Sequence, residues 1–286
     1  MPRRPLGRTG EYLSIIGMGG IVVMDEEQGH ADRVVREAFE AGVNYFDVAP
    51  TYGDAELKLG PALEPFRKKV FLACKTAERD RQGSQKELDE SLKHLRTDYL
   101  DLYQLHSIET REDVQQAFGP DGAMETFIEA RRQGKVRFLG FSAHSVEAAL
   151  AAMDNFDFDT VLLPVNAGCW LKGNFGPQVV EKAVEKKMGI LALKAGARSL
   201  LADRKKKVRP KCWYHPLLDE AGIAASYNFT LSLPVTAALP PGDEGLFRLA
   251  LKAAPNFIPV SGKDKEELEK WASALDPLFE YPAWES

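Results

Sequence analysis

Short apolar runs alternate along most of the chain with longer amphipathic stretches. The runs have the length and the content of β-branched and aromatic residues that are typical of buried strands. Eight of them stand out, at residues 14–17, 44–47, 70–75, 99–106, 136–142, 160–166, 189–194 and 236–239. Ahead of the first run, the pattern predicts a small hairpin that turns at Arg8-Thr9-Gly10.

Stretches between the runs carry apolar residues at helical spacing. We predict helices at residues 31–41, 84–95, 124–133, 146–153, 177–187, 217–231 and 244–251, and a closing helix at 263–275. The helix at 84–95 opens with Ser84 and Glu87, which have the spacing of a capping box.

Strand and helix alternate without a break in composition, which favours one closed parallel sheet. The fold class is therefore α/β, and the expected architecture is a (β/α)8 TIM barrel with an N-terminal β-hairpin and a C-terminal extra helix. We expect residues 1–286 to form a single domain. The main competitor is a doubly wound open sheet, but Met18-Gly19-Gly20 does not match the G-x-G-x-x-G phosphate-binding pattern expected after its first strand.

Charge and cysteine content exclude several classes of protein. The net charge is −5, and the one basic run, Arg204 to Lys207 with Arg209, is interpreted as a solvated loop, so nucleic acid is not an expected partner. No apolar run reaches the length of a membrane span or of a signal-peptide core. The cysteines, Cys74, Cys169 and Cys212, are widely spaced. We therefore predict a cytoplasmic protein, a monomer or small homo-oligomer, with no disulfide framework and no metal site.

Three successive predicted strands end in titratable side chains, namely Asp47, Lys75 and His106, and Tyr52 follows Asp47 after a short turn. Each alone also has an ordinary explanation, as a helix cap, a solvated charge or a core histidine. Because strand ends meet at one face of a barrel, where an unpaired buried charge costs roughly several kcal/mol, we expect these groups to satisfy one another. An ammonium beside a phenol lowers the pKa of the phenol, and an imidazole can orient a carbonyl oxygen. The hypothesis is that Asp47 and Lys75 tune Tyr52, which then protonates an oxygen.

Four segments resemble the aldo-keto reductases: GVNYFDVAPTYGDAE, VFLACKTA, DYLDLYQLH and GKVRFLGFSAHS. The resemblance implies a (β/α)8 barrel whose bottom is closed by the hairpin, an extended nicotinamide dinucleotide, and reduction of small carbonyl substrates to alcohols. It assigns Tyr52 as the general acid, Lys75 and Asp47 as the residues that set the pKa of Tyr52, and His106 as the residue that orients the carbonyl.

The resemblance also suggests residues that bind the cofactor and the substrate. Ser142 matches a nicotinamide contact, whereas Ala143 and Leu162 stand where the family often has Asn and Gln. Arg248 matches the arginine that faces the adenosine 2′-phosphate, which favours NADPH over NADH, although Asp243 and Glu244 would repel that phosphate. The cofactor set is Gly19, Gly20, Asp47, Ser142, Ala143, Leu162, Lys194, Ala195, Gly242 and Arg248, and the substrate set is Ile21, Trp170 and Trp213.

Two other functions remain open from the sequence. The same scaffold with altered contacts at Ala143 and Leu162 could sense a nicotinamide cofactor and turn over slowly. Alternatively, Lys75 could act as a Schiff-base nucleophile in a lyase. Asp47 argues against the lyase, because a paired carboxylate keeps Lys75 protonated.

Overall fold

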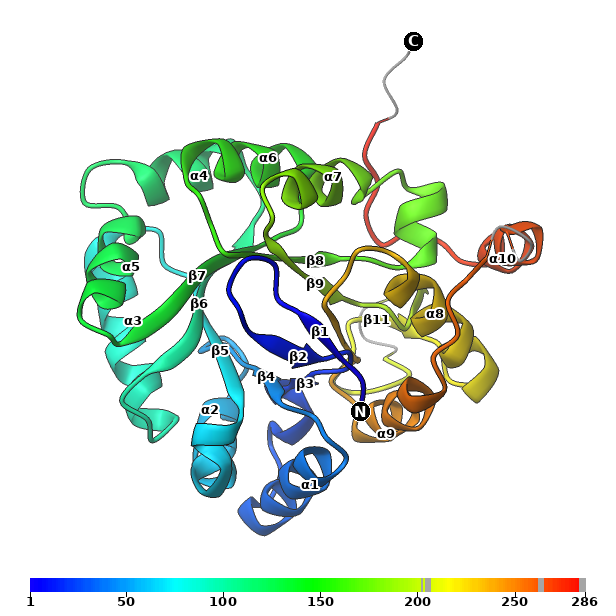
Figure 1. Cartoon of the computed structure of the whole chain (residues 1–286), viewed down its shortest axis with the longest axis horizontal. Coiled ribbons are helices and arrows are strands. Elements are labelled where there is room, and N and C mark those ends of the chain that lie inside the picture. The colour runs from blue at the N-terminus through cyan, green and yellow to red at the C-terminus, as the bar shows by residue number, and fades with distance from the viewer. Residues whose placement is uncertain (202, 204–206, 262–264, 283–286) are drawn as a thin grey trace.

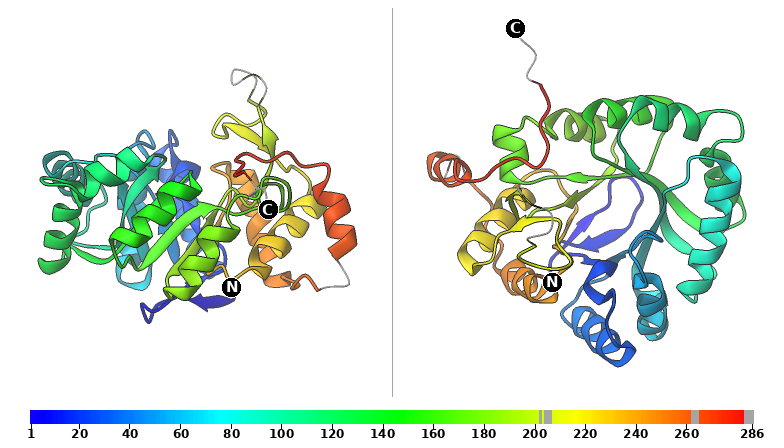
Figure 2. Two further views of the ribbon diagram at one scale, coloured as in Figure 1. Left: turned by 90° about the horizontal axis from the view of Figure 1, so that it is seen from above. Right: turned by 180° about the vertical axis from the view of Figure 1, so that it is seen from behind.

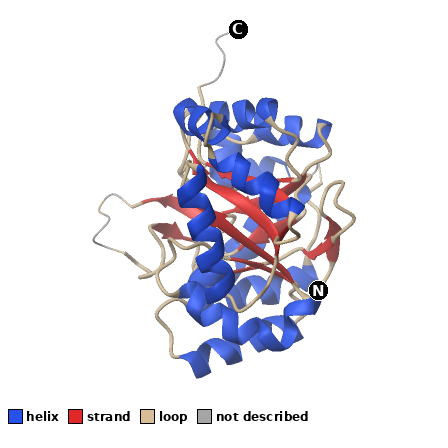
Figure 3. Cartoon of the chain, turned by 90° about the vertical axis from the view of Figure 1, so that its left-hand side faces the viewer, coloured by secondary structure: helices blue, strands red, loops and turns tan. Residues whose placement is uncertain are grey.

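A computed structural model describes residues 1–201, 203, 207–261 and 265–282 of the chain. Eight parallel strands form a barrel inside a ring of helices (Figures 1 and 3), as the alternating pattern predicts. Neighbouring strands follow the order β3, β4, β5, β6, β7, β8, β9 and β12. Their bounds are β3 Met18–Gly19, β4 Tyr45–Asp47, β5 Phe71–Thr76, β6 Leu100–Ile108, β7 Val136–Ala143, β8 Thr160–Pro164, β9 Gly189–Leu193 and β12 Ala237–Leu239.

The barrel closes between its first and last strands through a few backbone contacts. Ile16 forms a parallel bridge with Ala238. Gly17 N donates to Ala238 O at 3.0 Å, and Ala238 N donates to Ile15 O at 2.9 Å. The predicted first strand at 14–17 therefore has the wrong bounds: Ser14 ends the hairpin, and residues 15–17 close the barrel before β3 begins.

The predicted hairpin is present and plugs one end of the barrel. It pairs β1 Arg3–Pro5 with β2 Tyr12–Ser14 and lies across the centre of the ring of strands (Figure 1). Leu6 and Leu13 enter the apolar interior of the barrel. Arg4 Nη1 donates to Val235 O at 2.8 Å, which ties the hairpin to a residue 231 positions away.

Ten α-helices lie in the described part of the chain, two more than predicted. Two were not predicted: α2 because it contains Gly60 and Pro61, which are poor helix formers, and α4 because it is short and polar. Residues 263 and 264 of the predicted closing helix lie outside the described residues. The helices are α1 Gln28–Glu40, α2 Ala55–Leu63, α3 Arg81–His94, α4 Arg111–Phe118, α5 Ala123–Arg132, α6 Val146–Asn155, α7 Pro177–Glu185, α8 Glu220–Ser232, α9 Glu244–Ala253 and α10 Lys265–Ala272.

The predicted capping box in α3 is wrong. The helix begins at Arg81, and Asp80 caps it by accepting from Gly83 N at 2.8 Å. Ser84 lies inside the helix. Glu87 instead accepts from Thr76 Oγ1 at 2.5 Å and from Ala77 N at 2.9 Å, so it fixes the end of β5 next to the predicted catalytic lysine.

A second hairpin stands at the other end of the barrel. It pairs β10 Ala197–Leu200 with β11 Tyr214–Pro216, and Figure 2 (left) shows it in yellow, opposite the dark-blue hairpin β1–β2. Residues 204–206 of the basic run lie outside the described residues. Within the part of the chain that the structure describes, no helix combines the length and the hydropathy of a membrane span.

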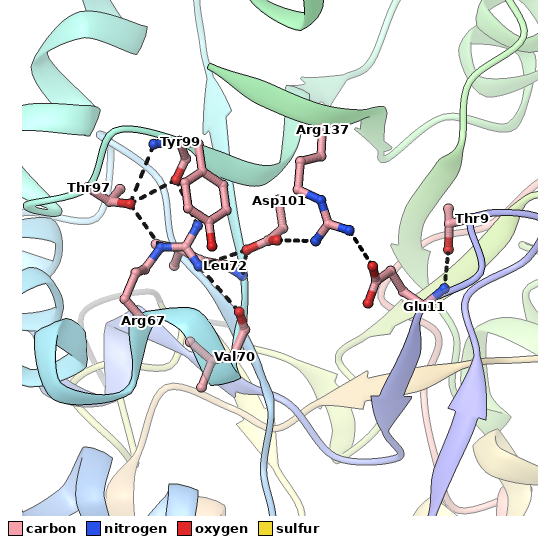
Figure 4. Close-up of polar contacts among 9 residues, drawn as sticks. All are labelled: Thr9, Glu11, Arg67, Val70, Leu72, Thr97, Tyr99, Asp101 and Arg137. Carbon is pink, nitrogen blue, oxygen red and sulfur yellow. Dashed lines mark hydrogen bonds and ion pairs between the residues drawn. The ribbon is translucent and has the colours of Figure 1, made fainter. Parts of the chain in front are cut away.

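A buried ion-pair network holds the plugged end together (Figure 4). Asp101, only 2% exposed, accepts from Arg67 Nη1 at 2.9 Å, from Arg137 Nη1 at 2.6 Å and from Leu72 N at 2.9 Å. Arg137 also pairs with Glu11 of the hairpin. The network therefore joins β5, β6, β7 and the hairpin through one carboxylate.

Replacing this carboxylate should destabilise the fold strongly. In Asp101→Asn the buried Arg67 guanidinium loses its counter-charge, which should lower the free energy of unfolding by about 3 kcal/mol. Urea unfolding followed by tryptophan fluorescence measures this. Glu11→Gln is the matched control, since it breaks a partly exposed pair and should cost about 1 kcal/mol or less. Equal losses in the two variants would contradict the central place of Asp101.

Candidate active site

The predicted catalytic side chains meet at the mouth of the barrel, opposite the hairpin β1–β2. Asp47 ends β4, Lys75 lies near the end of β5 and His106 lies near the end of β6, while Tyr52 is in the loop before α2. Lys75 is fully buried, and its Nζ donates to the Asp47 carboxylate and, at 3.0 Å, to Val48 O. The same Nζ lies 5.2 Å from the centre of the Tyr52 ring.

The Asp47 carboxylate receives two further hydrogen bonds. Its Oδ2 accepts from Tyr45 OH at 3.1 Å and from Gln104 Nε2 at 3.2 Å. The sequence-based site did not include these two residues. Strand alternation could have found them, because Tyr45 lies two positions before Asp47 on β4, and Gln104 lies two positions before His106 on β6.

The Lys75 ammonium and the Tyr52 phenol both keep their protons near neutral pH. Burial opposes the charge on Lys75, but Asp47 and Tyr52 outweigh it, so the pKa of Lys75 is raised. Burial raises the pKa of Tyr52, and the positive charge of Lys75 acts in the opposite direction. Lys75 thus works on Tyr52 in the direction that we hypothesised, but burial prevails and the pKa of Tyr52 stays above its ordinary value.

His106 also contacts Tyr52. The two rings lie 5.6 Å apart, edge to face, at an interplanar angle of 83°. Burial, together with the charges of Lys75, Arg79 and Lys194, lowers the pKa of His106 to about 3. The imidazole is therefore neutral at physiological pH and can orient an oxygen without competing with the phenol as a cationic acid.

Tyr52, Lys75 and His106 face a cleft of about 390 Å³. The predicted residues that line it are Ile21, Tyr52, Lys75, His106, Ser142, Lys194, Trp213 and Gly242. Among the described residues, four lysines line it, since Lys207 and Lys211 join Lys75 and Lys194, and no carboxylate does. A larger cavity, of about 720 Å³, lies between α8 and α10 and includes none of the predicted site residues.

The sequence of the chain is similar to that of a known protein family. The sequence profile of the Aldo/keto reductase family matches residues 16–236. The chain belongs to this family.

Curated relatives of this aldo/keto reductase match over part of their length. An uncharacterized oxidoreductase, YqkF, of Bacillus subtilis is 31% identical over 157 residues, which are 50% of this chain and 49% of the relative. L-galactose dehydrogenase of Arabidopsis thaliana is 30% identical over 173 residues, 55% of this chain and 53% of the relative. The chain thus spans about half the length of the curated relatives it matches.

Solved structures of the family share the fold. The holo form of aldo-keto reductase AKR11C1 from Bacillus halodurans superposes with a TM-score of 0.74 at 20% identity, covering 97% of this chain and 98% of that one. At this identity the likeness concerns the fold.

Several predicted residues of this aldo/keto reductase do not reach the cleft. Leu162 is fully buried in the apolar interior of the barrel, among the side chains that pack around Leu6 and Leu13, so its position does not suit the expected packing on a nicotinamide ring. Trp170 belongs to the π-helix Gly168–Lys172 outside the cleft lining. Gly19, Gly20, Asp47, Ala143, Ala195 and Arg248 also do not line it, and Asp47 acts there only through Lys75.

Arg248 is already occupied by carboxylates. It pairs with Glu37 at 2.6 Å and with Glu244 at 3.0 Å. Glu244 also lies 2.6 Å from His30 Nε2. A 2′-phosphate at this helix would therefore have to displace a carboxylate from Arg248.

His144, in the cleft beside Lys194, should make the fold sensitive to acid. Burial, with the charge of Lys194, lowers the pKa of His144 from 6.5 to about 2. Below pH 6.5 the unfolded chain therefore binds a proton that the folded chain does not. The free energy of unfolding thus decreases as the pH is lowered. Between pH 7 and 5 the wild type should lose about 2 kcal/mol more of its unfolding free energy than His144→Gln, as measured by urea unfolding at both pH values. Equal losses would show that His144 is not held neutral.

Proposed function

We propose that the chain reduces aldehydes or ketones to alcohols, with NADPH as the hydride donor and NADH as the weaker alternative. The observation that carries the proposal is the buried Lys75–Asp47 pair placed against the Tyr52 ring, with the His106 ring edge to face with the same ring. The family of the chain supports the same reaction class.

Each member of the group has a distinct task. Tyr52 donates its phenolic proton to the carbonyl oxygen as negative charge develops there. The Lys75 ammonium stabilises the phenolate that remains, and Asp47, with its donors Tyr45 and Gln104, keeps the ammonium in place. The neutral imidazole of His106 orients the carbonyl oxygen. The dinucleotide, when bound, supplies the hydride to the carbonyl carbon.

The cleft has the chemistry that a dinucleotide requires. Lys207 lines it and has no carboxylate partner among the described residues, which suits a bound phosphate, whereas Lys211 is already paired with Glu26 at 2.8 Å. Ser142 Oγ accepts from Ser107 N at 2.7 Å, so its own hydrogen can be donated to a carboxamide oxygen. Trp213 and Leu193 add apolar surface, and with it a leaning towards hydrophobic carbonyl substrates.

The alternatives are weaker on this geometry. A lyase acting through Lys75 is opposed by the raised pKa of that lysine and by its three partners. A cofactor-sensing module with little turnover would share the scaffold and the altered contact at Ala143. Titration with NADPH, followed by a panel of aldehydes, separates sensor from enzyme, because tight binding with negligible turnover would favour the sensor.

Removal of the proton donor tests the mechanism. Tyr52→Phe should lower kcat for aldehyde reduction by about a hundredfold or more, because it removes the acid and little else. The Kd of NADPH, measured by fluorescence titration, should change little. Tyr12→Phe makes the same chemical change at a residue that is 58% exposed on the hairpin, and it should be silent. A fully active Tyr52→Phe enzyme would overturn the role of Tyr52.

Cofactor preference is tested by freeing or removing Arg248. Glu37→Gln leaves the guanidinium with one carboxylate partner fewer, so the Kd of NADPH should fall while that of NADH stays unchanged. Arg248→Ala should raise the Kd of NADPH about tenfold and again spare NADH. If either variant shifts both cofactors equally, Arg248 does not contact the 2′-phosphate.

A further inference from the structure

A second lysine faces the cleft in an environment unlike that of Lys75. Lys194 follows β9 directly and has a left-handed backbone with φ of 59°. It is 8% exposed and lines the cleft. Among the residues that the structure describes, no carboxylate forms an ion pair with it. Its Nζ lies 3.0 Å from His144 Nε2 instead.

Two aromatic rings lie close to the Lys194 amine. Its Nζ is 5.3 Å from the centre of the Trp213 ring and 5.5 Å from that of Phe279. Phe279 in turn stacks on His144 at 5.0 Å. Burial lowers the pKa of Lys194 to about 7, although Cys169 and Glu109 act in the opposite direction. A part of the molecules therefore carries a neutral, nucleophilic amine near pH 7, whereas an ordinary lysine is almost wholly protonated there.

A hydrogen-bonded chain leads from this amine to solvent. His144 Nδ1 lies 2.9 Å from Ser107 Oγ, and Ser107 Oγ donates to Glu109 Oε1 at 3.2 Å. Glu109 has 60% of its side chain exposed. The left-handed Ser107, at φ of 55°, sits at the irregularity near the end of β6 that directs this hydroxyl towards His144. Protons can therefore move between Lys194 and bulk water without crossing the Tyr52 group.

We propose that Lys194 captures aldehydes in this cleft as a reversible Schiff base, with His144 as the group that moves the protons. The amine adds to the carbonyl carbon, so that a C–N bond forms as the C=O π bond breaks. The nitrogen gives up a proton, and the neutral imidazole of His144 passes it to the oxygen. A second proton converts the resulting hydroxyl to water, which leaves as the C=N bond forms. No electron donor is required, so this activity is separate from the proposed hydride transfer. Aldehydes with aromatic or apolar substituents suit the rings of Trp213 and Phe279.

Reductive trapping tests the proposal without any dinucleotide. The whole chain is incubated at pH 7 with benzaldehyde and sodium cyanoborohydride, and labelled lysines are located by peptide mass mapping. Lys194 should be labelled at least about tenfold faster than Lys252, which is 68% exposed. The rate at Lys194 should rise between pH 6 and 8, as its charge, set among His144, His106, Glu109 and Cys169, is lost. Labelling of Lys194 no faster than of Lys252 would overturn the proposal.

Matched variants separate the role of each group. His144→Gln should slow labelling of Lys194 about tenfold and leave Lys252 unchanged, and an unchanged rate at Lys194 would overturn the part assigned to His144. Lys194→Arg should remove this label while keeping a positive charge, and circular dichroism checks that both variants fold. Tyr52→Phe should label like the wild type, so a failure of the Schiff base and a failure of the proposed reduction are distinguishable. Slower labelling in Tyr52→Phe would contradict the separation of the two activities.

Discussion

The ion pair between Lys75 and Asp47 is the constraint around which the mouth of the barrel is arranged. Two charges removed from water at the strand ends would each cost several kcal/mol if left unpaired, roughly as much as a large part of the stability of a domain. Val48 O on the lysine side, and Tyr45 and Gln104 on the carboxylate side, complete the hydrogen bonding of the pair. A rigid buried cation beside Tyr52 follows from that arrangement, and the proposed proton transfer follows from the cation.

Two lysines in one cleft show how the surroundings of a lysine side chain set its charge. Lys75 is fully buried against a carboxylate, and its charge is locked. Lys194 is nearly as buried but has an imidazole in place of a carboxylate within hydrogen-bonding distance, and burial lowers its pKa to about 7. The difference lies in the partner rather than in the depth of burial, because desolvation disfavours both ammonium groups. The same cleft thus offers a fixed cation and an amine.

Local patterns in the sequence were enough to predict the barrel. The features that were predicted wrongly depend on contacts between residues far apart in the chain. The alternation of apolar runs predicted the eight strands, and the strand ends predicted that Asp47, Lys75 and His106 lie near Tyr52, because both depend on neighbours in the chain. The bounds of the first strand depend on Ala238, and the true partner of Glu87 is Thr76 rather than Ser84. Neither contact produces a periodic pattern of apolar residues in the sequence. The burial of Leu162 and the carboxylates around Arg248 likewise come from packing between distant segments.

The closure at Ile16 and Ala238 has a consequence for how the polypeptide reaches its final state. The first and last strands of the barrel are joined by backbone groups that lie far apart in the sequence. The Arg4 side chain likewise reaches Val235 O, 231 positions away. Until β12 has left the ribosome, the sheet of the nascent chain keeps two unpaired edges. Unpaired edges can pair with strands of other chains. Pairing of the first and last strands is therefore a late step of folding. The chain is most prone to aggregation before that step.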